Sequence, residues 1–223
     1  MSAMPAAAPI RLVIVDDEAL IRSGFAYILG AAQDIQVVAT ADGYDAVETV
    51  ESHRPDVVLL DIRMPGRSGL DVLTDLRRRG NPATVAMLTT FGSDKHVAAA
   101  LAAGAAGFFL KDTDPEQLPQ LVRTLHGGGV VFSPAVSRTV IAGYLRPKAP
   151  DDVRLVEKLS DRERTILVRL ATGASNAEIG QQLYLSPATV KAHISTILRK
   201  LEVEGRVAAA LVAERAGLLR GAS

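Results

Sequence analysis

The stretch Val57-Val58-Leu59-Leu60-Asp61 decides how the first half of the chain folds, because an unbroken apolar run ends there on an aspartate. An apolar run without alternation is typical of a parallel strand that is buried on both faces. Residues 11–15 form a second run of this kind, which is followed by Asp16 and Asp17. Helical patterns separate such runs, which predicts parallel strands joined by helices on both faces of one sheet.

Five β/α units can be traced as far as residue 126. The expected strands are residues 11–15, 35–39, 57–60, 84–88 and 107–110, and the expected helices are residues 21–29, 44–51, 70–79, 94–103 and 114–126. The last helix is placed at Asp114-Pro115, where an aspartate cap precedes a proline. The predicted fold class for residues 10–126 is therefore α/β, with a doubly wound, five-stranded parallel sheet.

The glycine run Gly127–Gly129 ends this pattern. Prolines and an acidic pair follow, which predicts a linker over residues 127–155 with a short helix of its own at residues 136–145.

From Leu159 onward the pattern is helical only. Ser160 and Ser175 each precede a glutamate by three residues, and Ser186 precedes a proline, which are signals for the start of a helix. Residues 156–220 are thus predicted to form a small all-α domain of four helices.

The composition excludes several classes of protein. The chain of 223 residues is 48% apolar and 22% charged, as in ordinary soluble proteins, and it lacks cysteine, which excludes disulfide scaffolds and thiolate sites. Its longest apolar run, residues 97–110, is shorter than the roughly 20 residues of a membrane span. Residues 1–9 carry no export signal and are expected to be disordered, so we expect a cytoplasmic protein without membrane contact.

The net charge of zero hides an asymmetry between the two halves. Residues 1–127 carry 11 basic and 16 acidic side chains, whereas residues 128–223 carry 14 and 9. A basic domain is a candidate for a polyanionic partner such as nucleic acid, although a split of this size also arises by chance.

Five polar side chains follow strands of the predicted sheet, at the edge where ligands gather in open parallel sheets. They are Asp16, Asp17, Asp61, Thr89 and Lys111. Converging carboxylates need a cation between them, and their hard oxygen ligands favour Mg²⁺. A lysine and a hydroxyl beside that ion would bind a phosphoryl group, and a carboxylate there can attack phosphorus to form an aspartyl phosphate. Each aspartate alone is better explained as a helix cap, but the full set is not.

Four segments resemble the receiver domain of bacterial two-component response regulators, over residues 10–126. They are Val13–Asp17, Leu60–Gly66, Leu88–Thr90 and Gly107–Lys111. The resemblance implies a flavodoxin-like fold with Asp61 as the phosphoacceptor. The Mg²⁺ ligands that it implies are Asp16, Asp17, Asp61 and the backbone carbonyl of Arg63.

The same resemblance implies a switch beside the phosphoacceptor. Thr89, Thr90 and Lys111 would face the phosphoryl oxygens, and Phe108 would enter the space that Thr89 vacates. Three positions depart from the commonest receiver pattern. Phe108 replaces a tyrosine, Thr90 stands where a smaller residue is common, and Asp112 stands where many receivers have proline.

An apolar stripe marks one helix of the basic domain. Its members, spaced along one helical face, are Val190, Ile194, Ile197, Leu198 and Leu201. The opposite face carries Lys191, Ser195 and Arg199 with Lys200 beside them. Such a face can contact phosphates through its cations and base edges through its first half, but a charged helix face is usually only solvated. The preceding helix, residues 176–183, and a turn of three residues fit helix-turn-helix geometry.

Residues 156–219 resemble the LuxR-type helix-turn-helix. The segments that carry the resemblance are Leu159–Glu163, Gly173–Gly180, Leu185–Ser195 and Lys200-Leu201 with Arg206. The resemblance implies that Lys191 and Ser195 reach bases. The other positions that it implies at the DNA surface are Asn176, Ser186, Thr189, Ala192, His193 and Arg199.

Further roles follow from this second resemblance. Glu163 and Arg206 would bridge helices, and the helix carrying Val207, Leu211 and Val212 would contact a second copy, although core packing explains each of those three equally well. Because one such domain covers only a short half-site, a homodimer is expected on DNA.

Together the two halves resemble the NarL/FixJ subfamily of response regulators. This resemblance implies a transcription factor, not an enzyme, whose partners are double-stranded promoter DNA, a sensor histidine kinase, a second copy and RNA polymerase. The alternatives are a phosphotransfer intermediate, a regulator of RNA or protein partners, and a receiver that no longer uses phosphate. The basic second domain weighs against a phosphotransfer intermediate. The low aromatic content of 4% weighs against a reader of single-stranded RNA. The complete acidic set weighs against a receiver that no longer uses phosphate.

Overall fold

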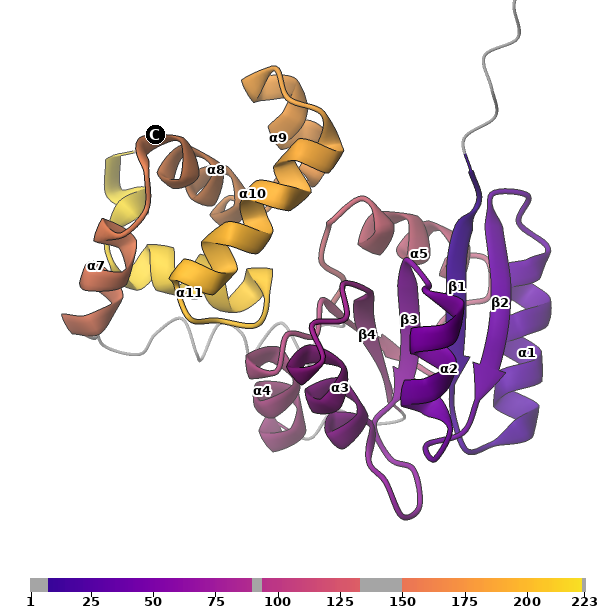
Figure 1. Ribbon diagram of the computed structural model, residues 1–223. Helices are drawn as coiled ribbons and strands as arrows, with labels where there is room; N and C mark the ends of the chain where they lie inside the picture. Colours follow the sequence, from indigo (N-terminus) through magenta and orange to yellow (C-terminus); the bar gives the residue numbers. More distant parts are fainter. Residues whose placement is uncertain (1–7, 90–93, 133–149, 222–223) are drawn as a thin grey trace, which may run out of the picture.

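The computed structural model describes residues 8–89, 94–132 and 150–221, which form two domains that lie side by side (Figure 1). The first domain is built on a five-stranded parallel sheet in the order β2-β1-β3-β4-β5, and the elements described in the second domain are helices. This order confirms the predicted doubly wound sheet, in which the direction of winding reverses between β1 and β3.

The carboxyl ends of the parallel strands lie at one edge of the sheet. The strands are β1 (Ile10–Val15), β2 (Ile35–Ala41), β3 (Val57–Asp61), β4 (Thr84–Thr89) and β5 (Gly107–Leu110). In the register of the sheet Val15 pairs with Leu60, Asp61 with Leu88, and Thr89 with Leu110. The residues that follow these strands are therefore brought together, although they are far apart in the sequence.

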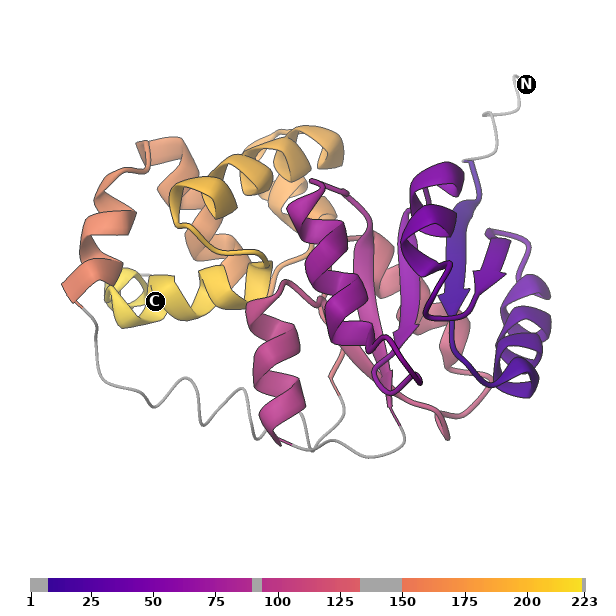
Figure 2. The ribbon, with the colours of Figure 1, turned by 60° about the horizontal axis from the view of Figure 1, so that its bottom comes forward.

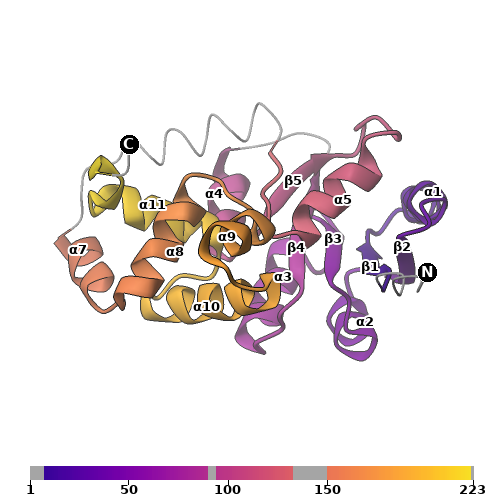
Figure 3. The same cartoon turned by 90° about the horizontal axis from the view of Figure 1, so that it is seen from above.

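Two apolar clusters cover the two faces of the sheet. The helices of this domain are α1 (Ala19–Gly30), α2 (Ala46–His53), α3 (Gly69–Arg78), α4 (Asp94–Ala102) and α5 (Leu118–His126). Helices α1 and α5 pack on one face through residues such as Leu29 and Val122, and α2, α3 and α4 pack on the other through residues such as Val50 and Leu73. Figure 3 shows α5 and the α2–α3 pair on opposite sides of the strands.

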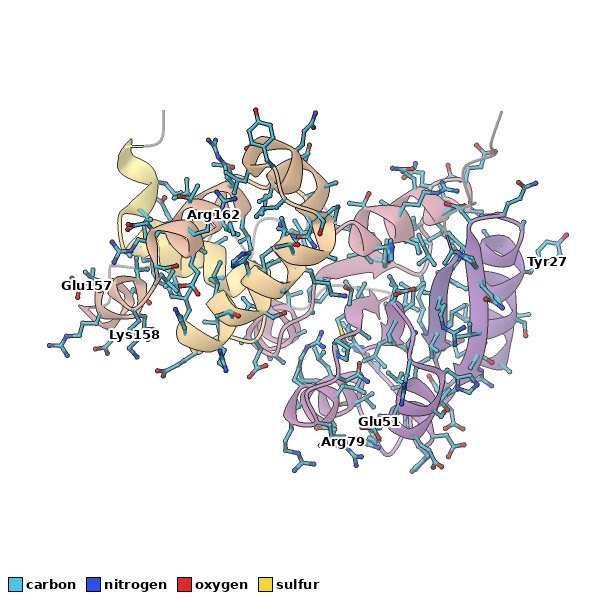
Figure 4. All side chains as sticks on the ribbon, turned by 45° about the horizontal axis from the view of Figure 1, so that its top comes forward. Tyr27, Glu51, Arg79, Glu157, Lys158 and Arg162 are labelled. Atoms are coloured by element: carbon cyan, nitrogen blue, oxygen red, sulfur yellow. The ribbon has the colours of Figure 1, made fainter. Side chains whose placement is uncertain are left out.

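The surface contacts between α2 and α3 contribute little to the stability of the fold in comparison with this core. Arg79, which follows α3, forms an exposed salt bridge of 3.0 Å with Glu51 of α2 (Figure 4). Exposed pairs of this kind contribute about 0 to 1 kcal/mol. The orientation of the two helices is thus set by their buried apolar side chains.

The last helix of the first domain starts later than the sequence predicted. The prediction placed its start at Asp114-Pro115, but α5 begins at Leu118. Asp114 accepts a hydrogen bond from the backbone of Glu116 and its carbonyl accepts another from Gln117, so residues 114–117 form a turn. Pro119 occupies the first turn of the helix, where a missing N–H costs nothing.

The second domain packs around one apolar cluster. Its helices are α7 (Pro150–Glu157), α8 (Asp161–Ala171), α9 (Asn176–Leu183), α10 (Pro187–Lys200) and α11 (Arg206–Arg215), followed by the short 3₁₀ helix η1 (Leu218–Gly221). The capping boxes predicted at Ser160 and Ser175 are both present. The stripe predicted on α10 is confirmed, because Val190, Ile197 and their partners on that face lie in the cluster.

Helix α7 extends this domain into the segment predicted to be linker. Asp152 bonds to Arg215 of α11, and Val156 lies in the apolar cluster. Both are side chains on a helix that begins at Pro150, five residues before the predicted end of the linker at residue 155. The short helix expected at residues 136–145 and most of the segment 1–9 lie outside the described residues.

Seen from below, the start of α11 lies beside α4 of the first domain (Figure 2). Within the described ranges, no helix combines the length and the apolar character that crossing a membrane requires.

Candidate functional site

Three carboxylates converge at the carboxyl edge of the sheet, as the sequence predicted. One oxygen from each of Asp16, Asp17 and Asp61 lies within 4.8 Å of the others. Asp16 and Asp61 are only 0% and 3% exposed, whereas Asp17 is exposed. The site therefore combines two buried charges with one at the surface.

Lys111 neutralises part of this charge. Its Nζ lies 2.8 Å from Oδ2 of Asp16, 3.0 Å from Oδ2 of Asp61 and 3.1 Å from Oε1 of Glu18. Burial by itself lowers the pKa of Lys111, but the hydrogen bonds that its ammonium group donates to these carboxylates outweigh this effect and raise that pKa, so the ammonium group stays charged. Sequence reasoning missed Glu18, and its position directly after Asp17 was the signal that could have found it.

The carboxyl of Asp61 is held in an unfavourable setting for a charge. Burial raises the pKa of Asp61, and the hydrogen bonds from Lys111 and from the backbone N–H of Arg63, at 3.2 Å, offset only part of this effect. Oδ2 of Asp16 is fully buried, and the ammonium group of Lys111, 2.8 Å away, is the partner that compensates its charge.

These carboxylates fit a hard divalent cation. Carboxylate oxygens such as those that converge from Asp16, Asp17 and Asp61 are the ligands that Mg²⁺ prefers. The backbone carbonyl of Arg63, which the resemblance implies as a further ligand, stays a prediction.

A small cavity of about 160 Å³ opens beside the carboxyl of Asp61. Its lining residues are Asp17, Glu18, Asp61, Arg63, Thr89 and Lys111. A volume of this size accommodates a phosphoryl group next to the aspartate. Thr89 is 5% exposed at the end of β4, where a small displacement would bring its hydroxyl to a group in this cavity.

The other expected members of the switch are placed only in part. Phe108 on β5 is buried, with its ring centroid 6.4 Å from that of Phe132. Thr90 lies outside the described residues. The described backbone contains no cis peptide bond, so the bond between Lys111 and Asp112 is trans.

Helix α10 presents a polar face opposite its apolar stripe. Lys191, Ala192, Ser195 and Arg199 are exposed, and His193 is half-buried. Ser186 caps the helix by accepting from the backbone N–H of Thr189, and the two hydroxyls lie 2.8 Å apart. These two side chains hold the helix end in place, and their contacts with DNA stay predictions.

Two basic residues have partners that the sequence did not indicate. Lys200 was expected beside the exposed cations, but its Nζ donates to Oε2 of Glu163 at 2.7 Å, so its charge is engaged within the domain. Arg206 donates to the carbonyl of Ala174 at 2.7 Å, and burial lowers its pKa to about 10. Glu163 thus connects α8 with α10, as expected, whereas Arg206 connects α11 with the loop between α8 and α9.

A groove lies between the polar face of α10 and the first domain. Figure 1 shows α10 on the side of its domain that is nearer the first domain. The groove has a volume of about 800 Å³. From α10 it is lined by Lys191, Ser195 and Arg199, and from the first domain by Arg77, Asn81 and Pro82 among others. In this arrangement part of the polar face of α10 is turned toward the first domain.

Backbone contacts hold the two domains in this arrangement. The N–H of Asn176 donates to the carbonyl of Gly127 at 3.0 Å, and a Cβ built on Gly205 would lie 2.9 Å from Cα of Gly104. Val207 of α11 packs into the apolar cluster of the first domain and Val212 lies in the core of its own domain, which agrees with core packing, the alternative to a contact between copies.

Comparison with known proteins covers both domains. Residues 12–123 match the response regulator receiver domain, and residues 157–213 match the luxR family of bacterial regulatory proteins. The chain is 42% identical over 214 residues to the nitrate/nitrite response regulator protein NarP of Escherichia coli (strain K12), covering 94% of this chain and 96% of NarP. It is 35% identical over 216 residues to the transcriptional regulatory protein LnrK of Bacillus subtilis (strain 168), covering 94% and 98%.

Among solved structures, the chain is similar to the response regulator ChrA of a heme-sensing two-component system. The TM-score is 0.51 at 33% sequence identity, and the match covers 95% of this chain and 99% of ChrA.

The bond between Glu163 and Lys200 makes the stability of the second domain depend on pH. Burial alone raises the pKa of Glu163, but its bonds to Lys200 and Ser160 outweigh this and lower the pKa below the ordinary 4.5. A carboxyl with a lowered pKa in the folded state stabilises the fold above its unfolded pKa and loses that contribution as the pH falls. We therefore expect Glu163→Gln to lower the free energy of unfolding at pH 7 by about 1 to 2 kcal/mol.

Urea unfolding at a series of pH values measures this effect. The difference from the wild type should shrink as the pH falls below about 4.5. Glu178→Gln is the matched control, because Glu178 completes the same capping box at Ser175 but is exposed. Glu178→Gln should lower the free energy of unfolding by less than Glu163→Gln does. A loss at Glu163→Gln that stays constant down to pH 3 would contradict the assignment.

Proposed function

Because this chain belongs to the response regulators that carry a receiver domain and a LuxR-type DNA-binding domain, we propose that it binds promoter DNA under the control of a phosphoryl group on Asp61. It is a DNA-binding transcription regulator of the NarL type. The observation that carries the proposal is the convergence of Asp16, Asp17, Asp61 and Lys111 around a cavity of about 160 Å³.

In the proposed reaction Oδ of Asp61 attacks the phosphorus of a phosphohistidine on a sensor kinase. The P–N bond breaks and the imidazole leaves with its electron pair, which takes up a proton. Asp16, Asp17 and Asp61 would hold Mg²⁺, which would supply charge neutralisation at the phosphoryl oxygens. Lys111 already lies 3.0 Å from Asp61 and binds a phosphoryl oxygen after transfer.

The signal then passes to the face of α4 and β5. Thr89 turns its hydroxyl toward the phosphoryl group, and Phe108 repacks in the space that this opens. The same face carries the second domain, because Gly104 follows α4 and meets Gly205, and Val207 packs into the cluster that includes Phe108. Repacking there weakens the contact between the domains.

Release of the second domain moves the first domain away from the polar face of α10, so that this face can enter the major groove. Lys191 and Ser195 contact bases, and Arg199 with the start of α9 contacts phosphates. Two copies bind paired half-sites as a homodimer. Because its target is genomic DNA, the protein acts in the cytoplasm of the bacterial cell.

Intact mass spectrometry tests the phosphoryl transfer. Wild type incubated with Mg²⁺ and phosphoramidate should gain one phosphoryl group, and Asp61→Asn should gain none. Omitting Mg²⁺ should abolish the gain in the wild type, because the converging carboxylates then repel the donor. An unmodified wild type, under conditions that label another receiver, would refute control by phosphate.

The role of Lys191 can be separated from that of Arg199 by binding to operator and random DNA. Lys191→Ala should reduce discrimination by on the order of tenfold, because a base contact is worth about 1 to 3 kcal/mol. Arg199→Ala should weaken binding to both DNAs alike and reduce the dependence on salt. Equal losses on both DNAs for Lys191→Ala would rule out base contact.

Gly205→Ser tests the contact between the domains. The backbone of Gly205 is extended at φ −155°, so serine fits there and caps α11, but its Cβ would lie 2.9 Å from Gly104. The unphosphorylated variant should bind DNA more tightly by about three- to tenfold, because the open state becomes more populated. Gly30→Ala, which meets nothing within 4 Å, is the control. Unchanged affinity of Gly205→Ser would argue against a closed state that excludes DNA.

A further inference from the structure

Glu18 is a fourth carboxylate at the phosphoryl site, and neither the carboxylate cluster nor the switch accounts for it. Its side chain is 60% exposed, lies 3.1 Å from Nζ of Lys111 and lines the same cavity as Asp61. Although Glu18 stands at the N-cap of α1, its side chain makes no capping hydrogen bond. Its backbone N–H donates to Oδ1 of Asp16 at 2.9 Å, which fixes the start of the helix without the carboxylate.

The position of Glu18 places a negative charge at the mouth of the cavity. Its oxygen and that of Asp61 contact the same Nζ at 3.1 and 3.0 Å, so the two oxygens are no more than about 6 Å apart. Asp16 and Asp61 are buried beneath, whereas Glu18 is reached from solvent. A phosphodonor that approaches Asp61 therefore passes close to this charge.

Like charges at this separation repel with an energy that grows in proportion to the charge of the donor. At an effective dielectric near that of water, a unit charge about 6 Å away costs under 1 kcal/mol, and a doubly charged donor costs twice as much. The penalty falls on free acyl phosphates, which are dianions at neutral pH. It is smaller for N-phosphorylated donors whose nitrogen carries a proton, because their net charge is lower.

We propose that Glu18 is a specificity-determining residue that selects phosphodonors by charge, disfavouring small dianionic acyl phosphates relative to donors with a phosphorylated, protonated nitrogen. This inference rests on the proposed transfer to Asp61. Its consequence is that the regulator reacts more readily with a phosphorylated nitrogen on a partner protein than with acyl phosphates in solution.

The test compares two donors on the full chain with Mg²⁺ at low ionic strength, with the rate of labelling of Asp61 followed by intact mass. Glu18→Gln should accelerate labelling by acetyl phosphate by about three- to tenfold. Labelling by phosphoramidate, which carries about half the net charge, should rise only by about the square root of that factor. The difference between variant and wild type should vanish in high salt, because an exposed charge is screened.

Two further variants serve as controls. Glu18→Asp retains the charge and should keep the selectivity of the wild type. Glu116→Gln removes an exposed charge that precedes α5 and has no contact with Lys111 among the described contacts, so its rates should not change.

Three results would overturn the inference. If Glu18→Gln accelerates both donors by one common factor, Glu18 acts through the position of Lys111 and not through charge. If neither rate changes while the wild type is labelled at Asp61, the inference fails and the proposed function stands. If the wild type is labelled by neither donor, the proposed function fails and the inference fails with it.

Discussion

The ammonium group of Lys111 is the contact on which the functional edge of the sheet depends. It lies within 3.1 Å of three carboxylates, two of which are almost completely buried. Removing it would leave Asp16 and Asp61 as adjacent buried charges without a counter-ion, which a fold tolerates only by protonating one of them. Lys111 therefore neutralises the negative charge of the site only in part. Binding of Mg²⁺ together with a phosphoryl group can complete the charge balance.

The same edge is connected to the second domain through one face of the sheet. Phe108 and Val207 lie in one apolar cluster, and Gly104 and Gly205 allow their backbones to approach closely. A change in packing near Thr89 is thus transmitted through close-packed side chains to the contact that keeps α10 facing the first domain. The fold places the chemical site and the docking site on neighbouring parts of one core.

Sequence reasoning was reliable where a local pattern has one structural meaning. Apolar runs that end on Asp16, Asp61 and Lys111 predicted strands and, through the geometry of parallel sheets, a common site. It failed where a side chain chooses between partners. Lys200 was expected among exposed cations, but it bonds to Glu163, which is 37 residues away in the chain. The start of α5 was misplaced because Asp114 caps a turn as readily as a helix.

The sequence by itself determined the two domains, the doubly wound parallel sheet of the first domain and the residues that meet at its carboxyl edge, because hydrophobic periodicity and capping signals act over a few residues. Only the tertiary structure decided that Glu18 joins Lys111 and that the face of α10 turns toward the first domain. The pairing of Glu18 with Lys111 and the orientation of α10 both depend on how distant segments of the chain are oriented relative to each other. The turn after β1 sets where Glu18 points, and the packing of α11 on α4 sets the orientation of a whole domain, which no local pattern encodes.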